Sequence, residues 1–407
     1  MKGKDAPSNV LLSLEKNMNN LIVELTKSAL FAEAEERTGL TDWGDTSVFE
    51  PALDQLLSAL ETEADLNRIG RFDSWMGITS RLQQRLLLRR AGYDRVPTQI
   101  ADKPALVIVG PPRTGTTLLQ RMLALDPETD ALRYCDVTYP VPATRPGTAE
   151  DEAKIKEVSA ELATLRKWAP DIIKIHEMEP RTPDEEVFLM NYTFTSFLEP
   201  LRAHVPSYWN WVLKSADLPA LYRELKHLIA YVGQYRSGSR WVLKAPQHLW
   251  MLRHLLDEFP NAHVIWTHRD PAKSVPSMCS MSRAVRKRNS GSAHNEEIGA
   301  DWLGMMAGGV AQAMQDRDKR PARLIFDVTF RDLMRDPEAL IREIYEAVGL
   351  DYPASMSTAI QRYLQENPRG KHGSHSYTAE EFGLSAGGIR EHFTAYLERY
   401  RVPIEDN

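Results

Sequence analysis

Cysteine and net charge are both scarce in this chain of 407 residues. Its two cysteines, Cys135 and Cys279, cannot form a disulfide framework and have no zinc-type spacing, which favours a reducing compartment such as the cytoplasm. The 50 Lys and Arg residues nearly balance the 56 Asp and Glu residues, giving a formal net charge of −6. This balance argues against a nucleic-acid partner or a general attraction to anionic membranes, so we expect any anion site to be local.

Long apolar runs are also missing. No run reaches the length that crosses a bilayer, and the first residues lack the apolar core and cleavage site of a secretion signal. Residues are nevertheless 43% hydrophobic, which allows a chain of this length to bury a substantial core. We therefore expect a folded, soluble, cytoplasmic protein without a transmembrane segment.

The most informative stretch runs from Ala105 to Leu125, with the sequence ALVIVGPPRTGTTLLQRMLAL. Residues 105–109 form a β-branched apolar run typical of a strand buried on both faces, and residues from Thr116 onward have helical periodicity. A strand followed by a Gly-rich loop and a helix is the order of elements in an anion cradle. The free backbone N–H groups of the first helical turn, the helix dipole and the Thr116 and Thr117 hydroxyls would all attract an anion.

The loop lacks one residue of the ATP- and GTP-binding pattern. That pattern has Gly, four residues, and then Gly-Lys-Ser/Thr. Here Gly115 follows Gly110 by five residues, but Thr116 stands where the Lys should be, and the only cation of the loop is Arg113. The loop therefore predicts a phosphate site without the usual metal; a plain strand-to-helix turn is the alternative, which the polar residues disfavour.

The chain divides into a helical part and an α/β part. From Val10 to about Tyr93 the pattern is helical, with a capping box predicted at Ser47 and Glu50 and an amphipathic helix over 75–88. A polar passage over 94–104 then separates this part from the first strand. We predict an α-helical N-terminal extension over residues 1–100 and an α/β domain over residues 101–407.

Three more strands are predicted over 241–243, 264–267 and 324–328, each followed by a helical segment. Alternating strands and helices indicate an α/β fold with a parallel sheet flanked by helices. Because ligands lie at the carboxyl ends of such strands, the segments 110–117, 244–248 and 268–277 should converge on one crevice.

Each strand end carries polar side chains. Lys244 and His248 follow one strand, and a neutral imidazole can take a proton from a hydroxyl. Arg269 and Ser277 follow the next strand and could grip one phosphate; the alternative for Arg269 is an ion pair with Asp270 or another acid. The acidic residues within 176–186 are well placed to stabilise the start of a helix.

Together these strand ends resemble the sulfotransferases that use 3′-phosphoadenosine 5′-phosphosulfate (PAPS) as donor. The resemblance runs from about Pro104 to the C-terminus. The segment 112–117 looks like the family's 5′-phosphosulfate loop, whose residues here are Arg113, Thr114, Gly115, Thr116 and Thr117. Arg269 and Ser277 match the pair that binds the 3′-phosphate. More loosely, Asn367–His372 resembles a basic segment that closes over that phosphate, with Arg369, Gly370 and Lys371 as its candidates.

The helical N-terminal part, Trp241–Leu249 and His268–Pro271 look like the branch of the superfamily common in bacteria. In that branch a Glu often precedes a Pro-x-Pro after the loop helix, whereas this chain has Asp136 ahead of Pro140-Val-Pro142. The resemblance therefore leaves two candidates for the catalytic base, Asp136 and His248.

The implied reaction is an in-line transfer of a sulfuryl group from PAPS to a hydroxyl or amine of a small-molecule acceptor, with 3′-phosphoadenosine 5′-phosphate (PAP) as product and no metal. Arg113 and Lys244 are expected to stabilise the leaving oxygen. An apolar or aromatic alcohol is the expected acceptor, and a homo-oligomer is left open. Candidate pocket residues, which could equally be core, are Trp209, Trp211, Phe194, Phe197, Tyr192 and Met178.

Two other functions are weighed. A nucleotide kinase or hydrolase would need the missing loop Lys and an acid that holds magnesium. A non-catalytic nucleotide-binding protein on the same fold would keep the donor site, and Asp136 in place of Glu is its best support.

Overall fold

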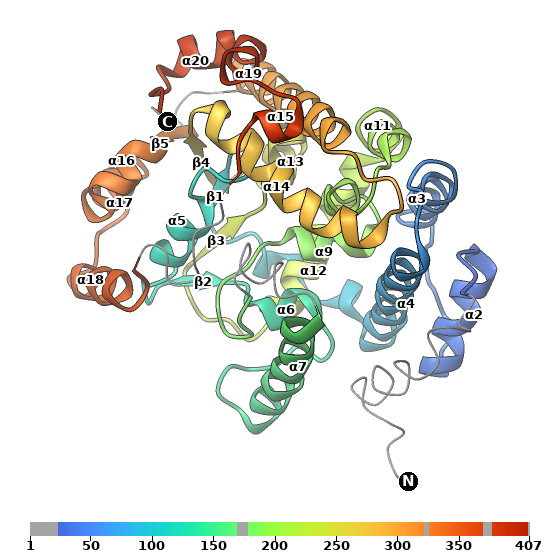
Figure 1. Cartoon of the computed structure of the whole chain (residues 1–407). Coiled ribbons are helices and arrows are strands. Elements are labelled where there is room, and N and C mark those ends of the chain that lie inside the picture. Colours follow the sequence, from blue (N-terminus) through green and yellow to red (C-terminus); the bar gives the residue numbers. More distant parts are fainter. Residues whose placement is uncertain (1–22, 169–177, 321–324, 369–376, 406–407) are drawn as a thin grey trace.

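A parallel β-sheet of five strands forms the centre of the computed structural model, which describes residues 23–168, 178–320, 325–368 and 377–405 (Figure 1). The strand order is β2-β3-β1-β4-β5, and every neighbouring pair is parallel. The strands are β1 (Ala105–Val109), β2 (Thr129–Ala131), β3 (Arg240–Lys244), β4 (Ala262–His268) and β5 (Ile325–Thr329). The predicted α/β fold is confirmed. The edge strand β2 was not predicted, since its three residues, Thr-Asp-Ala, carry no apolar run.

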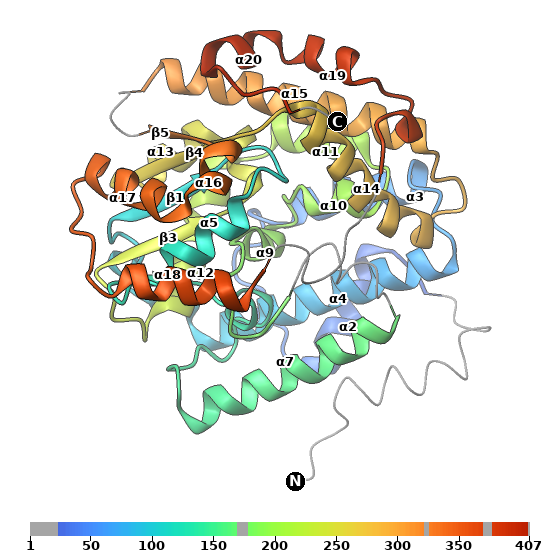
Figure 2. The same ribbon diagram turned by 60° about the vertical axis from the view of Figure 1, so that its left-hand side comes forward.

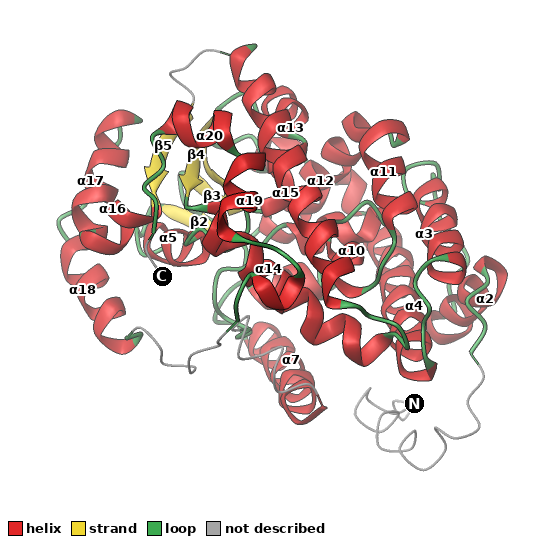
Figure 3. Ribbon diagram, turned by 45° about the horizontal axis from the view of Figure 1, so that its top comes forward, coloured by secondary structure: helices red, strands yellow, loops and turns green. Residues whose placement is uncertain are grey.

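Alternate residues of each strand face opposite layers. The sheet separates two hydrophobic cores, a smaller one on one face and a larger one on the other. Leu106 and Ile108 of β1 belong to the smaller core, whereas Val107 and Val109 belong to the larger core. The helices of the smaller layer are α5 (Thr116–Leu123), α16 (Phe330–Arg335), α17 (Pro337–Ala347) and α18 (Met356–Glu366). Because both faces are covered, all five residues of β1 are buried, as Figure 3 shows for the sheet among its helices.

The larger layer consists of helices from the middle and the end of the chain. Its middle members are α9 (Val187–Met190), α10 (Leu198–Arg202), α11 (Pro206–Ser215), α12 (Leu218–Gly233) and α13 (Leu252–Glu258). Its later members are α14 (Pro271–Asn289), α15 (Asn295–Asp318), α19 (Ala386–His392) and α20 (Thr394–Tyr400). No helix in the described ranges is long and apolar enough to cross a membrane.

Three described helices precede the sheet: α2 (Lys27–Thr38), α3 (Glu50–Thr62) and α4 (Arg68–Ala91). Their apolar residues belong to the same core as the larger face of the sheet. The predicted capping box is wrong: Phe49 is the N-cap residue of α3 and no side chain caps it, while the backbone N–H of Ser47 donates to Asp45. The division at residue 100 stays a prediction.

The helices α6 (Tyr134–Thr138) and α7 (Ala149–Trp168) follow β2 in the sequence. Both line the cavity that is described below. In Figure 2, α7 and α4 lie along the lower part of the molecule. Helices α4 and α7 provide much of the cavity wall that faces the carboxyl ends of the strands.

Candidate active site

The loop after β1 approaches β4 so closely that Gly110 has no room for a side chain. A Cβ at this position would lie 2.3 Å from Thr267 Oγ1. Two further residues have left-handed backbone, Arg113 at φ 71° and Gly115 at φ 88°. Such a conformation costs a non-glycine residue on the order of 1–3 kcal/mol, so Arg113 is held there by its surroundings. The loop thereby turns the Arg113 side chain away from the core, and the residue is exposed.

Helix α5 presents its N-terminus to the cavity. Its N-cap residue is Gly115, which offers no side chain to satisfy the first backbone N–H groups. Thr116 and Thr117 follow and line the cavity with Arg113. The partial positive charge of the helix start and these donors would attract an anion, so the anion cradle stays a prediction that this geometry fits.

Thr114 points away from this cradle. Its side chain is fully buried, and its hydroxyl donates to the Pro111 carbonyl at 2.8 Å. The same oxygen lies 2.6 Å from Thr267 Oγ1. The Thr114 hydroxyl therefore holds the ends of β1 and β4 together, and its backbone alone is left to face a ligand.

Lys244, at the end of β3, contacts two acidic residues that are adjacent in the sequence, Glu185 and Glu186. Lys244 Nζ forms an ion pair with Glu185 and donates to Thr117 Oγ1 at 3.3 Å. The backbone N–H of Lys244 donates to Glu186 Oε2 at 2.7 Å. Glu185 lines the cavity, so a carboxylate lies beside the loop helix. Sequence reasoning missed it because acids before a helix are well explained by the helix dipole.

His248 lies behind this pair. Its ring is completely buried, with Nε2 2.8 Å from Glu186 Oε1 and Nδ1 2.8 Å from the Tyr222 hydroxyl. Both ring nitrogens are therefore occupied by protein partners, and His248 does not line the cavity. The ring links β3, α12 and the segment before α9.

Asp136 belongs to a buried cluster of ions. Arg133 donates to both of its oxygens at 2.9 Å, and Arg236 pairs with Oδ2. Arg133 also bonds Asp151 at 2.7 and 3.0 Å. Burial opposes ionisation of Asp136, but the hydrogen bond from Arg133 and the charge of Arg236 outweigh it and hold the pKa of this carboxyl below its ordinary value. The carboxylate anchors α6 and does not line the cavity.

Arg269 and Ser277, the predicted phosphate pair, meet the loop after β1. Arg113 Nε donates to Ser277 Oγ at 3.1 Å, and Arg269 Nη1 donates to the Arg113 carbonyl at 3.0 Å. Arg269 stacks on the Phe330 ring at 3.9 Å and binds the Glu405 carboxylate at 2.8 and 3.1 Å. Although Arg113 is accessible from the cavity, desolvation by the protein around it lowers the pKa of the guanidinium, and the neighbouring charge of Arg269 acts in the same direction. The carboxylate of Glu405 therefore already occupies the planar fork of Arg269.

Arg369, Gly370 and Lys371 lie outside the described residues. Of the six candidate pocket residues, Tyr192, Phe197 and Met178 line the cavity, whereas Phe194, Trp209 and Trp211 do not. Trp209 instead packs edge-on against Trp250, with ring centroids 5.6 Å apart.

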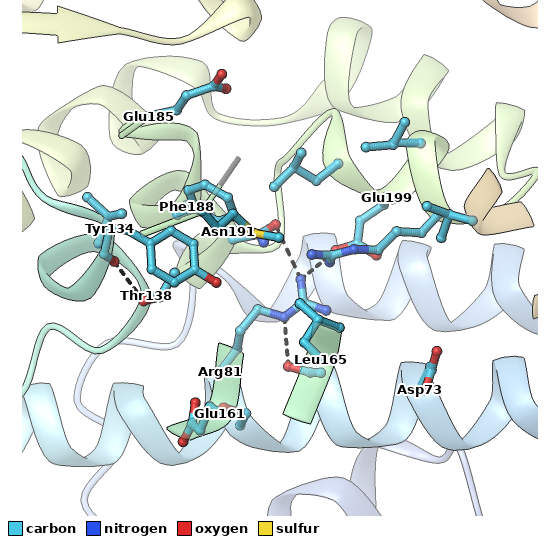
Figure 4. A pocket seen from close by; sticks show the side chains of 18 of the residues that line it. Asp73, Arg81, Tyr134, Thr138, Glu161, Leu165, Glu185, Phe188, Asn191 and Glu199 are labelled. Carbon is cyan, nitrogen blue, oxygen red and sulfur yellow. Dashed lines mark hydrogen bonds and ion pairs between the residues drawn. The ribbon is translucent and has the colours of Figure 1, made fainter. Parts of the chain in front are cut away.

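A cavity of about 1530 Å³ joins the loop after β1, Arg269 and Glu185. One end contains Arg113, Thr116, Thr117, Arg269 and Ser277, and the wall continues along α4, α7, α10 and α14. Figure 4 shows Glu185 on one side of this space, with Phe188 and Asn191 beyond it. A cavity that reaches from an anion cradle into an apolar chamber can hold two substrates at once.

The parallel sheet, the glycine-rich loop between β1 and α5, and the arginine that follows β4 together have the arrangement of a P-loop-like α/β fold. The family model described as "Sulfotransferase family" matches residues 104–354, and the chain belongs to this family.

Its relatives include mycobacterial sulfotransferases. The chain is 23% identical over 315 residues to the omega-hydroxy-beta-dihydromenaquinone-9 sulfotransferase Stf3 of Mycobacterium bovis, covering 74% of this chain and 76% of that protein. The crystal structure of sulfotransferase STF1 from Mycobacterium tuberculosis superposes with a TM-score of 0.82 at 28% identity, covering 91% of this chain and 98% of that one. The structure of STF9 from Mycobacterium avium has a TM-score of 0.84 at 24% identity, covering 95% and 100%, and supports the fold.

Proposed function

We propose that this sulfotransferase uses PAPS as donor and an apolar alcohol as acceptor, with Glu185 as the catalytic base. The observation that carries the proposal is the position of Glu185, which lines the acceptor cavity and contacts Lys244, itself a neighbour of the loop-helix residue Thr117.

The residues present fit a donor with two phosphate ends. The α5 N-terminus with Thr116 and Thr117 would hold the 5′-phosphosulfate, and Arg269 with Ser277 would hold the 3′-phosphate. Thr116 in place of the loop Lys disfavours the kinase or hydrolase alternative. PAPS supplies the sulfuryl group and a phosphate leaving group.

Arg113 and Lys244 would stabilise the charge that accumulates on the leaving phosphate oxygen. Glu185 would accept the proton of the acceptor hydroxyl while the oxygen of that hydroxyl attacks sulfur. We assign the base to Glu185 rather than to Asp136 or His248, because neither of those side chains lines the cavity. Asp136 is held by Arg133 and Arg236, and both ring nitrogens of His248 have protein partners.

The acceptor side of the cavity is mostly apolar. Phe188, Phe197, Leu198, Leu201, Met278 and Met281 contribute to its wall. The relative Stf3 is named for sulfating a hydroxylated menaquinone, an acceptor with a long apolar body. The apolar wall supports the same general class of acceptor for this chain.

The test is transfer of labelled sulfate from PAPS to a panel of long-chain alcohols, phenols and sterols, with products identified by mass spectrometry. We expect sulfation of at least one apolar alcohol. A donor-binding protein that sulfates no member of the panel or of a cell extract would support the non-catalytic alternative. In parallel, PAP should raise the melting temperature more than ATP with magnesium; the reverse order would favour the kinase or hydrolase.

A further inference from the structure

The Arg202 side chain faces the acceptor cavity. Arg202 ends α10 and lines the cavity, and 40% of its side-chain surface is accessible. Because Arg202 lines the cavity, part of this accessible surface faces the cavity space, and burial lowers the pKa of the guanidinium. A cation in such a place costs free energy unless an anion accompanies it.

The protein supplies only part of the negative charge that would balance Arg202. In the described part of the chain, the ion-pair partner of Arg202 is Glu199, whose Oε1 lies 3.5 Å from Nη1. The same Oε1 accepts a shorter hydrogen bond of 2.6 Å from Arg81. One carboxylate therefore serves two guanidiniums, which leaves an excess positive charge at this wall.

The other charged groups nearby do not cancel this excess. Asp73 also lines the cavity, but its carboxylate pairs with Arg288 at 3.0 Å and attracts Arg202 only from a longer distance. Glu157 and Glu161 line the cavity from α7, and in the described part of the chain neither forms an ion pair with Arg202. The Arg202 guanidinium is a planar fork of N–H donors. Among the described residues, its hydrogen bond to a protein acceptor is the long one to Glu199.

This charged wall lies apart from the proposed base. Figure 4 shows Glu185 on one side of the pocket and Glu199 and Asp73 on the other, with Phe188 and Asn191 between them. Because Arg202 contacts Glu199, it belongs to the far side. Met278, Met281 and Leu201 line the same cavity with apolar surface.

We propose that Arg202 binds a carboxylate at the far end of an elongated apolar acceptor, whose hydroxyl lies at Glu185. The inference rests on the proposed function for the position of the hydroxyl, but the anion site itself depends only on the cavity and its charges. The acceptor class is therefore a hydroxy acid with a long apolar body, and Arg202 is its specificity-determining residue.

The first experiment measures binding without catalysis. Straight-chain fatty acids of graded length and their methyl esters are titrated against the whole protein with PAP present, followed by calorimetry. The acid and its ester differ in charge at one end, so we expect at least one acid to bind about tenfold or more tightly than its ester, the range of a charge-assisted hydrogen bond. Arg202→Met should abolish this preference, and Arg202→Lys should keep part of it.

The matched control is Arg283→Met on α14, which removes another guanidinium, paired with Glu381 and absent from the cavity lining. This variant should keep the preference for the acid. Equal affinity of wild-type protein for acid and ester at every length would overturn the proposal, as would an unchanged preference in Arg202→Met.

The second experiment separates this inference from the proposed function. Long-chain ω-hydroxy acids and the matching 1-alkanols are compared as acceptors with PAPS, and we expect a lower KM for the hydroxy acid in wild-type protein but not in Arg202→Met. Equal KM values in wild-type protein would contradict the inference and leave the sulfotransferase assignment intact. An Arg202-dependent preference for the acid in binding, with no sulfation of either acceptor, would instead contradict the proposed apolar-alcohol function.

Discussion

Arg269 holds the carboxylate of Glu405 in a two-bond ion pair, Nε to Oε1 at 2.8 Å and Nη2 to Oε2 at 3.1 Å. Glu405 is kept in place by its backbone N–H, which donates to Asp270, the N-cap residue of α14. The carboxylate thus occupies the guanidinium that we assign to the 3′-phosphate.

Glu405→Gln should therefore tighten PAP binding. Removing the competing charge frees the Arg269 fork, and because the pair is partly exposed we expect a gain of about two- to fivefold. Calorimetric titration at low and high salt measures the effect, which should shrink as salt screens the pair. Glu398→Gln, an exposed acid on α20, is the control. Weaker PAP binding in Glu405→Gln would show that the carboxylate supports the site instead of competing for it.

Glu185→Gln should lower kcat about a hundredfold to ten-thousandfold, the usual contribution of a general base. The amide keeps the size of the side chain but cannot accept the acceptor proton, so PAP affinity should change little by comparison. Steady-state kinetics and PAP titration measure both. Glu343→Gln, an exposed acid on α17, should keep full turnover. If Glu185→Gln retained wild-type kcat while His248→Gln or Asp136→Asn lost it per folded molecule, the base would be reassigned.

Thr114→Val should act on stability, and Thr116→Val on donor binding. The Thr114 hydroxyl is buried and bonded to Pro111 and Thr267, so its loss leaves Thr267 poorly satisfied at a cost of about 1–3 kcal/mol in the free energy of unfolding. Thr116 lines the cavity, and we assign its hydroxyl to the donor's 5′ end. Denaturant unfolding and PAP titration separate the two effects. A larger loss of PAP affinity in Thr114→Val than in Thr116→Val, at equal stability, would contradict this division.

Asp136→Asn should destabilise the protein and flatten its response to acid. The pKa of Asp136 is held below the ordinary 3.8, so its stabilising contribution is complete above that pH and is lost as the pH falls below it. Breaking this buried pair should cost about 3–5 kcal/mol at neutral pH.

Urea unfolding between neutral and acidic pH measures the Asp136 effect. Glu152→Gln removes an exposed partner of Arg181 and should change stability by less than about 1 kcal/mol. A stable Asp136→Asn protein with strongly reduced kcat would point instead to a catalytic role for this carboxylate.

Local patterns carried much of the fold. The β-branched run 105–109 and the apolar segments before Lys244 and His268 specify strands buried on both faces, whichever way the rest of the chain packs. The strand-loop-helix order then places Thr116 and Thr117 at a helix start. The edge strand β2 escaped prediction because its pairing with β3, rather than its composition, makes it a strand.

Carboxylates were harder to assign. Asp136 and Glu185 each precede or open a helix, and nothing local distinguishes them. Asp136 is held by Arg133, three residues before it, and by Arg236, a hundred residues away in the chain, whereas Glu185 meets Lys244 from 59 residues away. Whether an acid is buried in an ion cluster or lines a cavity depends on these distant partners.

The sequence by itself determined the parallel sheet, the glycine-rich loop at 110–117 between a strand and a helix, and the placement of Arg269 and Ser277 after a strand, because each follows from periodicity and local geometry over a few residues. Only the tertiary structure decided that Thr114 turns inward, that Glu405 pairs with Arg269 and that Arg202 faces the cavity. Those outcomes depend on which groups meet across the fold, where burial and charge set the free energy of each side chain.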